Sequence, residues 1–183
     1  MWRLSRPDAT SALDHPGVRT SLPRYVDIVK NRKKAKFILD KSIFADFLPN
    51  ESTNNLWNLH KEHLQDYRQF EIDVDNGKEY KPLNNKLSFL DLKIELGKRI
   101  MKNCHFCEKR CGIDRHSDEK GECKVGKKFS VSTCFPHLGE EPELVPSGTV
   151  FTLGCTIKCI HCQNWGISQW RENGTPVSPE NMA

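Results

Sequence analysis

Apolar side chains recur at helical spacing in two early stretches of the chain. Across residues 27–48 they keep a three- to four-residue period that stops at Pro49, which predicts one helix. Across residues 56–70 the same period follows a polar cluster at residues 52–55 and predicts a second helix. Residues 1–26 are interrupted by prolines and predict an irregular arm.

A third helix has the clearest sequence pattern. Ser88 and Asp91 have the spacing of a capping box, in which each side chain accepts a hydrogen bond from a free backbone N–H of the first turn. One apolar face then follows at helical spacing: Phe89, Leu92, Leu96 and Ile100. The preceding residues 73–85, which include Asn76-Gly77 and Pro82, predict a loop.

The second half of the chain holds one clear strand pattern. Residues 149–153 are all β-branched or apolar, which predicts a buried strand that ends at Gly154. Near the C-terminus, Ser178 and Pro179 have the order of a helix cap and a first helical position. We therefore expect an α/β fold preceded by a helical region.

Composition and charge exclude several classes of protein. The chain has 183 residues, 37% hydrophobic and 28% charged, which suits one modest domain or a domain with an appendage. The net charge of +4 comes partly from basic residues 30–36, which we interpret as a solvated helix face and not as a nucleic-acid surface. No apolar run approaches the roughly 18 residues that span a bilayer, and no apolar region follows the basic residues 1–6, so we expect neither a membrane span nor a secretory signal. These features predict a cytoplasmic protein.

The cysteines change this picture more than the charge does. All eight lie between Cys104 and Cys162, and without an export signal such clustering favours metal ligands over disulfides. His60 and His63 are interpreted as packed or surface side chains, because no third ligand accompanies them. Cys134 lies outside the two cysteine groups and is expected to be a small buried or free thiol.

The upstream cysteine group supplies four thiols within twenty residues: Cys104, Cys107, Cys111 and Cys123. A C-x-x-C turn directs two sulfurs to one ion, and the nearby glycines allow the tight backbone that such a turn needs. Four thiolates can close a tetrahedral zinc site or hold a second Fe–S cluster, and softness alone does not separate the two. His105 or His116 can replace one of the thiolates.

The downstream cysteine loop supplies three thiols in the spacing C-x-x-x-C-x-x-C: Cys155, Cys159 and Cys162. Three ligands are too few for a closed structural zinc site. They suit a 4Fe–4S cluster in which three irons are bound by thiolates and one iron stays open.

This loop and its flanks resemble a known superfamily. The cysteine spacing, directly after a strand and a glycine, is similar to that of the radical S-adenosylmethionine (radical SAM) enzymes. More narrowly, the flanks resemble proteins related to pyruvate formate-lyase activating enzyme, which also have a cysteine group ahead of the loop. The matching segments are Gly139-Glu-Glu-Pro142, Ser147-Gly-Thr149, Cys162-Gln-Asn164 and Ile167-Ser-Gln169. The resemblance covers about residues 88–183.

The resemblance implies a cofactor and a reaction. The three cysteines of the downstream loop would hold a 4Fe–4S cluster whose open iron binds S-adenosylmethionine. One electron, from a donor such as a flavodoxin or ferredoxin, would cleave this cofactor to a 5′-deoxyadenosyl radical that acts on a partner or a small substrate. His161 stands where the superfamily usually has an aromatic residue near the adenine. No catalytic side chain is assigned.

The resemblance also implies the start of a partial (β/α) barrel, with the cluster loop after its first strand. A complete barrel takes about 250 residues, and twenty-one residues follow Cys162. We therefore expect a truncated chain that is inactive alone, with the full-length parent as the enzyme. The expected segments are a helical extension at residues 1–87, a helix with the metal-binding cysteines at 88–135, and the barrel start at 136–183.

Two other functions stay open at this point. In the first, both cysteine groups are structural and the protein is a non-catalytic zinc or Fe–S module that binds a partner. The second, a two-cluster electron carrier, is less favoured because the C-x-x-C-x-x-C-x-x-x-C-P run is not present.

Overall fold

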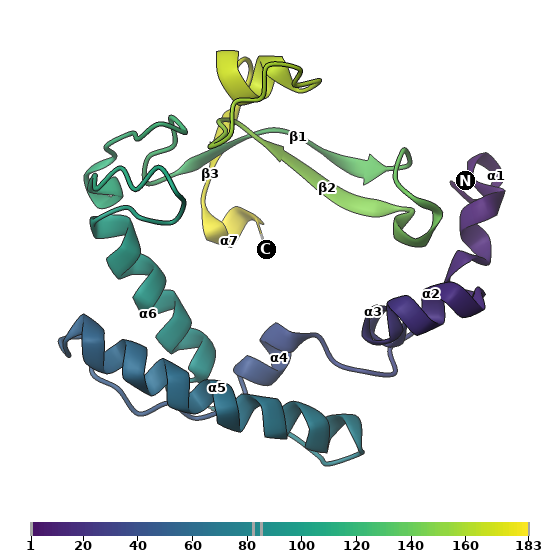
Figure 1. The fold of residues 1–183 in the computed structure, drawn as a ribbon, viewed down its shortest axis with the longest axis horizontal. Helices are drawn as coiled ribbons and strands as arrows, with labels where there is room; N and C mark the ends of the chain where they lie inside the picture. The colour runs from purple at the N-terminus through teal and green to yellow at the C-terminus, as the bar shows by residue number, and fades with distance from the viewer. Residues whose placement is uncertain (1, 82, 85, 183) are drawn as a thin grey trace. The chain divides into compact units, whose positions relative to one another are not determined.

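The structure is a computed structural model that describes residues 2–81, 83–84 and 86–182. The chain divides into two compact units. The first, called here the cysteine unit, comprises Met1–Val18 and Ile100–Ala183, and the second, called the helical unit, comprises Arg19–Arg99. Figure 1 labels the helices and strands of both. This division differs from the three expected segments, which stay a prediction.

The described residues of the helical unit form four main helices: α3 (Pro23–Val29), α4 (Lys36–Asp40), α5 (Thr53–Asp75) and α6 (Phe89–Lys102). Helix α2 (Pro16–Ser21) enters this unit from the cysteine unit, and α6 leaves it with its last residues. The second predicted helix is confirmed as α5, which is longer than expected. It begins where the Ser52 side chain accepts a hydrogen bond from the Asn55 N–H at 3.1 Å.

The predicted single helix across residues 27–48 is wrong. Helix α3 ends before a charged stretch in which Asn31 has a left-handed φ of 56°, so the helix cannot continue through it. After α4 the chain is extended, because the Ala45 N–H bonds to the Leu87 carbonyl at 3.0 Å and Phe44 pairs with Ser88. Backbone pairing with a distant segment therefore replaces the expected helix.

The expected loop at residues 73–85 is partly helical. Helix α5 continues to Asp75, and the chain then turns at Gly77. Pro82 and Asn85, which the loop prediction included, lie outside the described residues.

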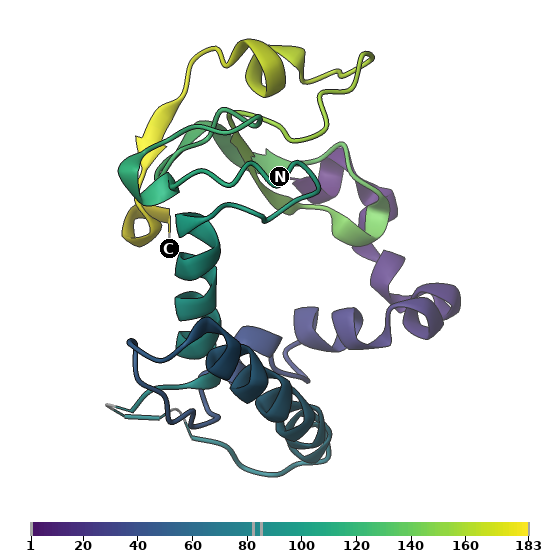
Figure 2. The ribbon, with the colours of Figure 1, turned by 60° about the vertical axis from the view of Figure 1, so that its left-hand side comes forward.

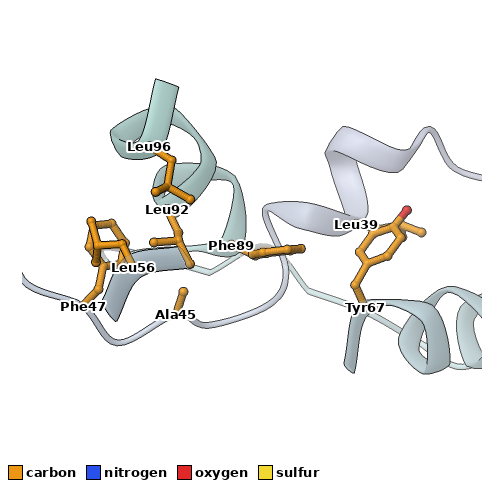
Figure 3. Packing of buried hydrophobic residues seen from close by; sticks show 8 residues of the cluster. All are labelled: Leu39, Ala45, Phe47, Leu56, Tyr67, Phe89, Leu92 and Leu96. Carbon is orange, nitrogen blue, oxygen red and sulfur yellow. The ribbon is translucent and has the colours of Figure 1, made fainter. Parts of the chain in front are cut away.

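The core of the helical unit joins α4, α5 and α6 (Figure 3). Its buried members are Leu39, Ala45, Phe47, Leu56, Tyr67, Phe89, Leu92 and Leu96. Phe89 is fully buried at the start of α6, and the rings of His60 and His63 lie 5.2 and 5.6 Å from its centroid. The Lys93 ammonium lies 4.1 Å from the same centroid. The two histidines thus pack around an aromatic side chain, as expected.

The capping box at the start of α6 is confirmed. The Ser88 N–H donates to the Asp91 carboxylate at 2.8 Å, and the Asp91 N–H donates to the Ser88 hydroxyl at 3.3 Å. From this fixed start, α6 runs to Lys102 and brings the chain to Cys104.

The cysteine unit is built on a small antiparallel sheet of β1 (Phe129–His137), β2 (Ser147–Thr152) and β3 (Thr175–Val177), in the order β2-β1-β3 (Figure 1). The predicted strand is confirmed as β2. Its residues alternate between half-buried and exposed, so the expectation of a buried strand is wrong. The described residues are thus mixed α/β with an antiparallel sheet, and the barrel start stays a prediction.

The N-terminal residues form short helices where an irregular arm was expected. These are α1 (Trp2–Ser5), η1 (Pro7–Thr10) and η2 (Ala12–Asp14). The Arg6 guanidinium donates to the backbone carbonyls of Leu138 and Glu140, the latter at 3.0 Å. This contact holds the N-terminal segment to the turn between β1 and β2.

Loops fill much of the rest of the cysteine unit. Between α6 and β1 the described chain has one 3-10 helix, η3 (Arg115–Ser117), and the rest of this stretch is a long irregular loop in both views (Figures 1 and 2). Two further turns, η4 (Pro142–Leu144) and the π-helical η5 (Gly166–Trp170), flank β2 and the downstream cysteine loop. Helix α7 (Pro179–Met182) begins after Ser178, as predicted. None of the helices in the described part of the chain is long and apolar enough to cross a membrane.

Candidate metal centre

The upstream cysteine group begins in a loop closed by backbone hydrogen bonds. The Cys104 N–H donates to the Ile113 carbonyl at 3.0 Å, and the Gly112 N–H donates to the Cys104 carbonyl at 2.9 Å. Within this loop the Arg110 N–H donates to the Cys107 carbonyl at 3.0 Å and closes a tight turn. Cys104 is 2% exposed. The C-x-x-C segment is therefore fixed by its own backbone, and its role as a metal-binding knuckle stays a prediction.

Arg115 lies among the upstream thiols, with 8% of its surface exposed. Its Nε donates to the Cys104 sulfur at 3.0 Å and its Nη2 donates to the Cys123 sulfur at 3.3 Å, while Nη1 donates to the Val125 carbonyl. Burial opposes the positive charge, but the bonds to the two sulfurs outweigh it and raise the pKa of Arg115. No sequence pattern singles out this residue, because an arginine in a polar loop is usually exposed.

Gly121 lies close to both the Cys111 thiol and the Arg115 guanidinium. A Cβ at Gly121 would lie 2.8 Å from the Cys111 sulfur and 3.3 Å from Nη2 of Arg115. The neighbouring Glu122 N–H donates to the Cys111 sulfur at 3.5 Å. A side chain at position 121 would therefore displace either the thiol or the guanidinium.

The two predicted histidine alternatives are both exposed. The ring Nδ1 of His105 lies 2.6 Å from the Asn103 carbonyl, so this nitrogen is occupied by the backbone. His116 follows Arg115 in η3, and its backbone N–H donates to the Asp114 carboxylate at 2.8 Å.

The downstream loop starts at Gly154, which contacts the upstream group directly. Gly154 has a φ of 91°, and a Cβ there would lie 2.3 Å from the Cys123 carbonyl oxygen. Only glycine combines this backbone conformation with so close an approach. An open groove of about 760 Å³ continues from this contact. Thiol-bearing residues from both groups line it: Cys104, Cys107, Cys123 and Cys155.

The segment Ile167–Gln169 fixes the downstream loop at three points. The Gly154 N–H donates to the Ile167 carbonyl at 2.9 Å, and the Gln169 amide donates to the Cys159 carbonyl at 3.0 Å. The Ser168 hydroxyl lies 3.3 Å from the Cys162 sulfur. This segment was one of those on which the sequence resemblance rested. Its contacts give it a physical role in shaping the loop.

The downstream thiols are half-buried and free of disulfides. Backbone N–H groups of Lys158 and then Ile157 bond to the Cys155 sulfur and hold the pKa of this thiol below its ordinary value. The loop turns its apolar side chains outward, with Ile157 74% and Ile160 95% exposed. His161 is exposed beside Cys162.

The described residues include candidate metal ligands, but these ligands are not arranged as a formed coordination sphere. All eight cysteines are free thiols, and Cys134 is exposed on β1 apart from the others. Among the residues that the structure describes, no three Cys, His, Asp or Glu side chains are grouped so as to hold a metal ion. Their chemistry nonetheless fits zinc or an iron–sulfur cluster, both of which are bound by thiolates.

Two curated relatives match the chain. It is 42% identical over 169 residues to the uncharacterized protein MJ0674 of Methanocaldococcus jannaschii, a match that covers 88% of this chain and 48% of the relative. It is 30% identical over 98 residues to the uncharacterized protein MJ0808 of the same organism, covering 43% of this chain and 29% of the relative. The chain thus spans about half of the first relative's length and less of the second's. No protein-family model and no solved structure matches the chain.

Proposed function

We propose that the chain carries the cluster-binding part of a radical SAM enzyme. The observation that supports this most is the downstream loop: three free thiols follow β2 and Gly154, and Ile167–Gln169 holds the loop by three contacts. Two independent features of the sequence, the cysteine spacing and the flanking segment, therefore belong to one local structure.

The residues of the loop have separate tasks in this proposal. Cys155, Cys159 and Cys162 bind three irons of a 4Fe–4S cluster, and the fourth iron is left for S-adenosylmethionine. When bound, such a cluster would pass one electron from the external donor to S-adenosylmethionine, and the carbon–sulfur bond would break to give methionine and a 5′-deoxyadenosyl radical. The N–H groups that point at Cys155 favour its thiolate form, which is the form that binds iron. His161, next to the last ligand, provides a ring for the adenine.

The surface of the loop suits the partners that this reaction needs. Ile157 and Ile160 face outward, so the loop is accessible to a second molecule. We propose S-adenosylmethionine and a one-electron donor such as a flavodoxin or ferredoxin as partners, with a cytoplasmic setting. The activity of the whole protein, hydrogen abstraction from a partner protein or small substrate, rests on the same proposal.

Anaerobic reconstitution of the chain with iron and sulfide tests the proposal. We expect about four irons and four sulfides per chain that depend on the three loop cysteines, and a change in the electron paramagnetic resonance spectrum of the reduced cluster when S-adenosylmethionine is added. Replacing the loop cysteines together by Ala should abolish both, and the matched control Cys134→Ser should leave both unchanged. An iron content that does not fall by about four per chain in the triple replacement, or a spectrum indifferent to S-adenosylmethionine, would contradict the proposal.

A non-catalytic metal module is the second candidate function. The burial of Cys104 and Arg115 favours it, because a closed thiolate site inside a loop stabilises structure and offers no open position. A colourless chain that holds zinc and takes up no iron at the downstream loop would support this candidate over the first.

A further inference from the structure

A buried guanidinium among thiols is an unusual arrangement that the proposed reaction does not use. Each nitrogen of Arg115 that can donate has a partner: two are cysteine sulfurs and one is a backbone carbonyl. A buried cation is costly unless an anion accompanies it. Among its described side-chain hydrogen bonds the cation has no carboxylate partner, and the side-chain atoms that accept from it are the Cys104 and Cys123 sulfurs.

We propose that Arg115 is the positioning residue and counter-charge of a metal–thiolate centre bound by the upstream cysteine group. Its ligands are Cys104, Cys107, Cys111 and Cys123. Four thiolates around Zn²⁺, or around a 4Fe–4S cluster of charge 2+, form a centre with a formal charge of about −2. One guanidinium at contact distance offsets about half of this charge.

The shape of the guanidinium explains why an arginine occupies this position. Its Nε and Nη2 hydrogens form one edge of a planar fork, so the two sulfurs that they bind are presented side by side. The Val125 carbonyl binds Nη1 and fixes the plane. A lysine would keep the charge, but it has a single nitrogen and cannot hold both sulfurs in this geometry.

Cys111 and Cys107 complete the set from the closed loop. Gly121 leaves room both for the Cys111 sulfur and for Nη2 of Arg115, and Cys107 lines the same groove as Cys104 and Cys123. Hydrogen bonds to bound sulfurs are a recognised way to strengthen metal sites, and their loss typically weakens metal binding about 10- to 100-fold. This inference does not depend on the downstream loop.

The experiment uses the whole chain with Cys155, Cys159 and Cys162 replaced by Ala, which isolates the upstream group. Zinc and iron with sulfide are offered separately, and bound metal is measured by elemental analysis and by competition with a chelator. Arg115→Met removes both charge and fork, and Arg115→Lys removes the fork alone. Arg110→Met is the matched control, because the Arg110 side chain lies in the same loop and is 73% exposed.

We expect one centre per chain in the isolating background, about 10- to 100-fold weaker metal retention in Arg115→Met, and an intermediate loss in Arg115→Lys. Arg110→Met should retain metal as the background does. A spectroscopic readout separates positioning from mere folding. The sulfur-to-metal charge-transfer band of a cobalt-loaded sample, or the reduction potential of an iron–sulfur sample, should shift in both Arg115 variants and not in the control.

Each result decides the inference. Zinc uptake or iron–sulfide uptake with the predicted loss at Arg115 supports it and identifies the centre. Metal retention and spectra unchanged in Arg115→Lys overturn it, even if Arg115→Met does not fold. A background chain that binds neither zinc nor iron overturns the upstream centre while leaving the proposal for the downstream loop intact, because that proposal is tested by iron that depends on the downstream cysteines.

Discussion

The two units of the chain differ in what holds them together. Nine buried apolar residues of the helical unit lie on or between its helices: Val26, Leu39, Ala45, Phe47, Leu56, Tyr67, Phe89, Leu92 and Leu96. In the described residues of the cysteine unit the buried apolar set is Ala9, Cys104, Val145 and Leu153. The larger unit by residue range therefore has the smaller core.

The residues of the packed core and the candidate metal ligands therefore lie mostly in different units. The helical unit contains a packed core and none of the eight cysteines. The cysteine unit contains every candidate ligand but has few buried apolar residues, and metal binding commonly supplies folding free energy where a core is this small. We infer that metal binding contributes to the fold of the cysteine unit and not to that of the helical unit.

Metal removal should produce the largest difference between the units. With the proposed metal centre at the upstream cysteine group, we expect a chelator to remove most of the hydrogen-exchange protection from residues 104–123, because the binding of metal by thiolates is coupled to folding. Protection in α5 and α6 up to Arg99 should change little. Amide exchange measured by mass spectrometry gives both values in one sample. Equal protection with and without chelator throughout residues 104–123 would contradict the inference that metal binding contributes to the fold of the cysteine unit.

Phe89→Ala should have the opposite pattern. Removing this fully buried ring leaves a cavity at the start of α6 and should lower the free energy of unfolding of the helical unit by about 3–5 kcal/mol. Urea denaturation followed by circular dichroism measures it. Phe37→Ala is the control, since that side chain is 55% exposed and its loss should cost less than about 0.5 kcal/mol. The metal content per folded chain should be the same in Phe89→Ala and Phe37→Ala. A lower metal content in Phe89→Ala alone would contradict the inference that metal binding is independent of the helical unit's core.

Gly154→Ala should damage both cysteine groups at once. The added Cβ meets the Cys123 carbonyl and forces a residue with a side chain into a φ of 91°, at a cost of about 1–3 kcal/mol. Iron and zinc content should fall together, as measured by elemental analysis. Gly148→Ala is the control, because nothing lies within 4 Å of its added Cβ. Loss of downstream iron alone would show that the two groups are not connected through this glycine.

Ser88→Ala should have the smallest effect. It removes one half of the capping box of α6 and should cost about 1 kcal/mol in the free energy of unfolding of the helical unit. Thermal denaturation resolves a change of this size. A shift as large as that of Phe89→Ala would mean that the hydroxyl does more than cap the helix.

Local patterns were sufficient for the elements that depend on nearby residues. The Ser88–Asp91 capping box, the helix α5 without its full length and the strand β2 without its half-exposed faces were predicted, because their determinants lie within a few positions of one another. The helix across residues 27–48 was wrong because Ala45 bonds to Leu87, a partner that no local pattern indicates. Strand β1 was not predicted, although residues 129–135 are rich in β-branched and aromatic side chains, and Pro136 at its end weakens such a pattern.

The candidate sites divide in the same way. The cysteines and the flanking Ile167–Gln169 segment could be identified from spacing and resemblance alone. Arg115 and the contact between Gly154 and Cys123 could not, because each depends on loops that meet only in the folded chain. A buried arginine has no distinguishing neighbour pattern in sequence. The burial that identifies it is a property of three-dimensional packing.

The exposed thiol of Cys134 on β1 has a practical consequence for studying the other seven. An alkylating reagent should modify Cys134 first, whether or not metal is bound. Its rate of modification therefore serves as an internal reference for exposure to the reagent. The remaining cysteines should react more slowly when they bind metal. The ratio of each rate to that of Cys134 then identifies which cysteines in the two groups are ligands.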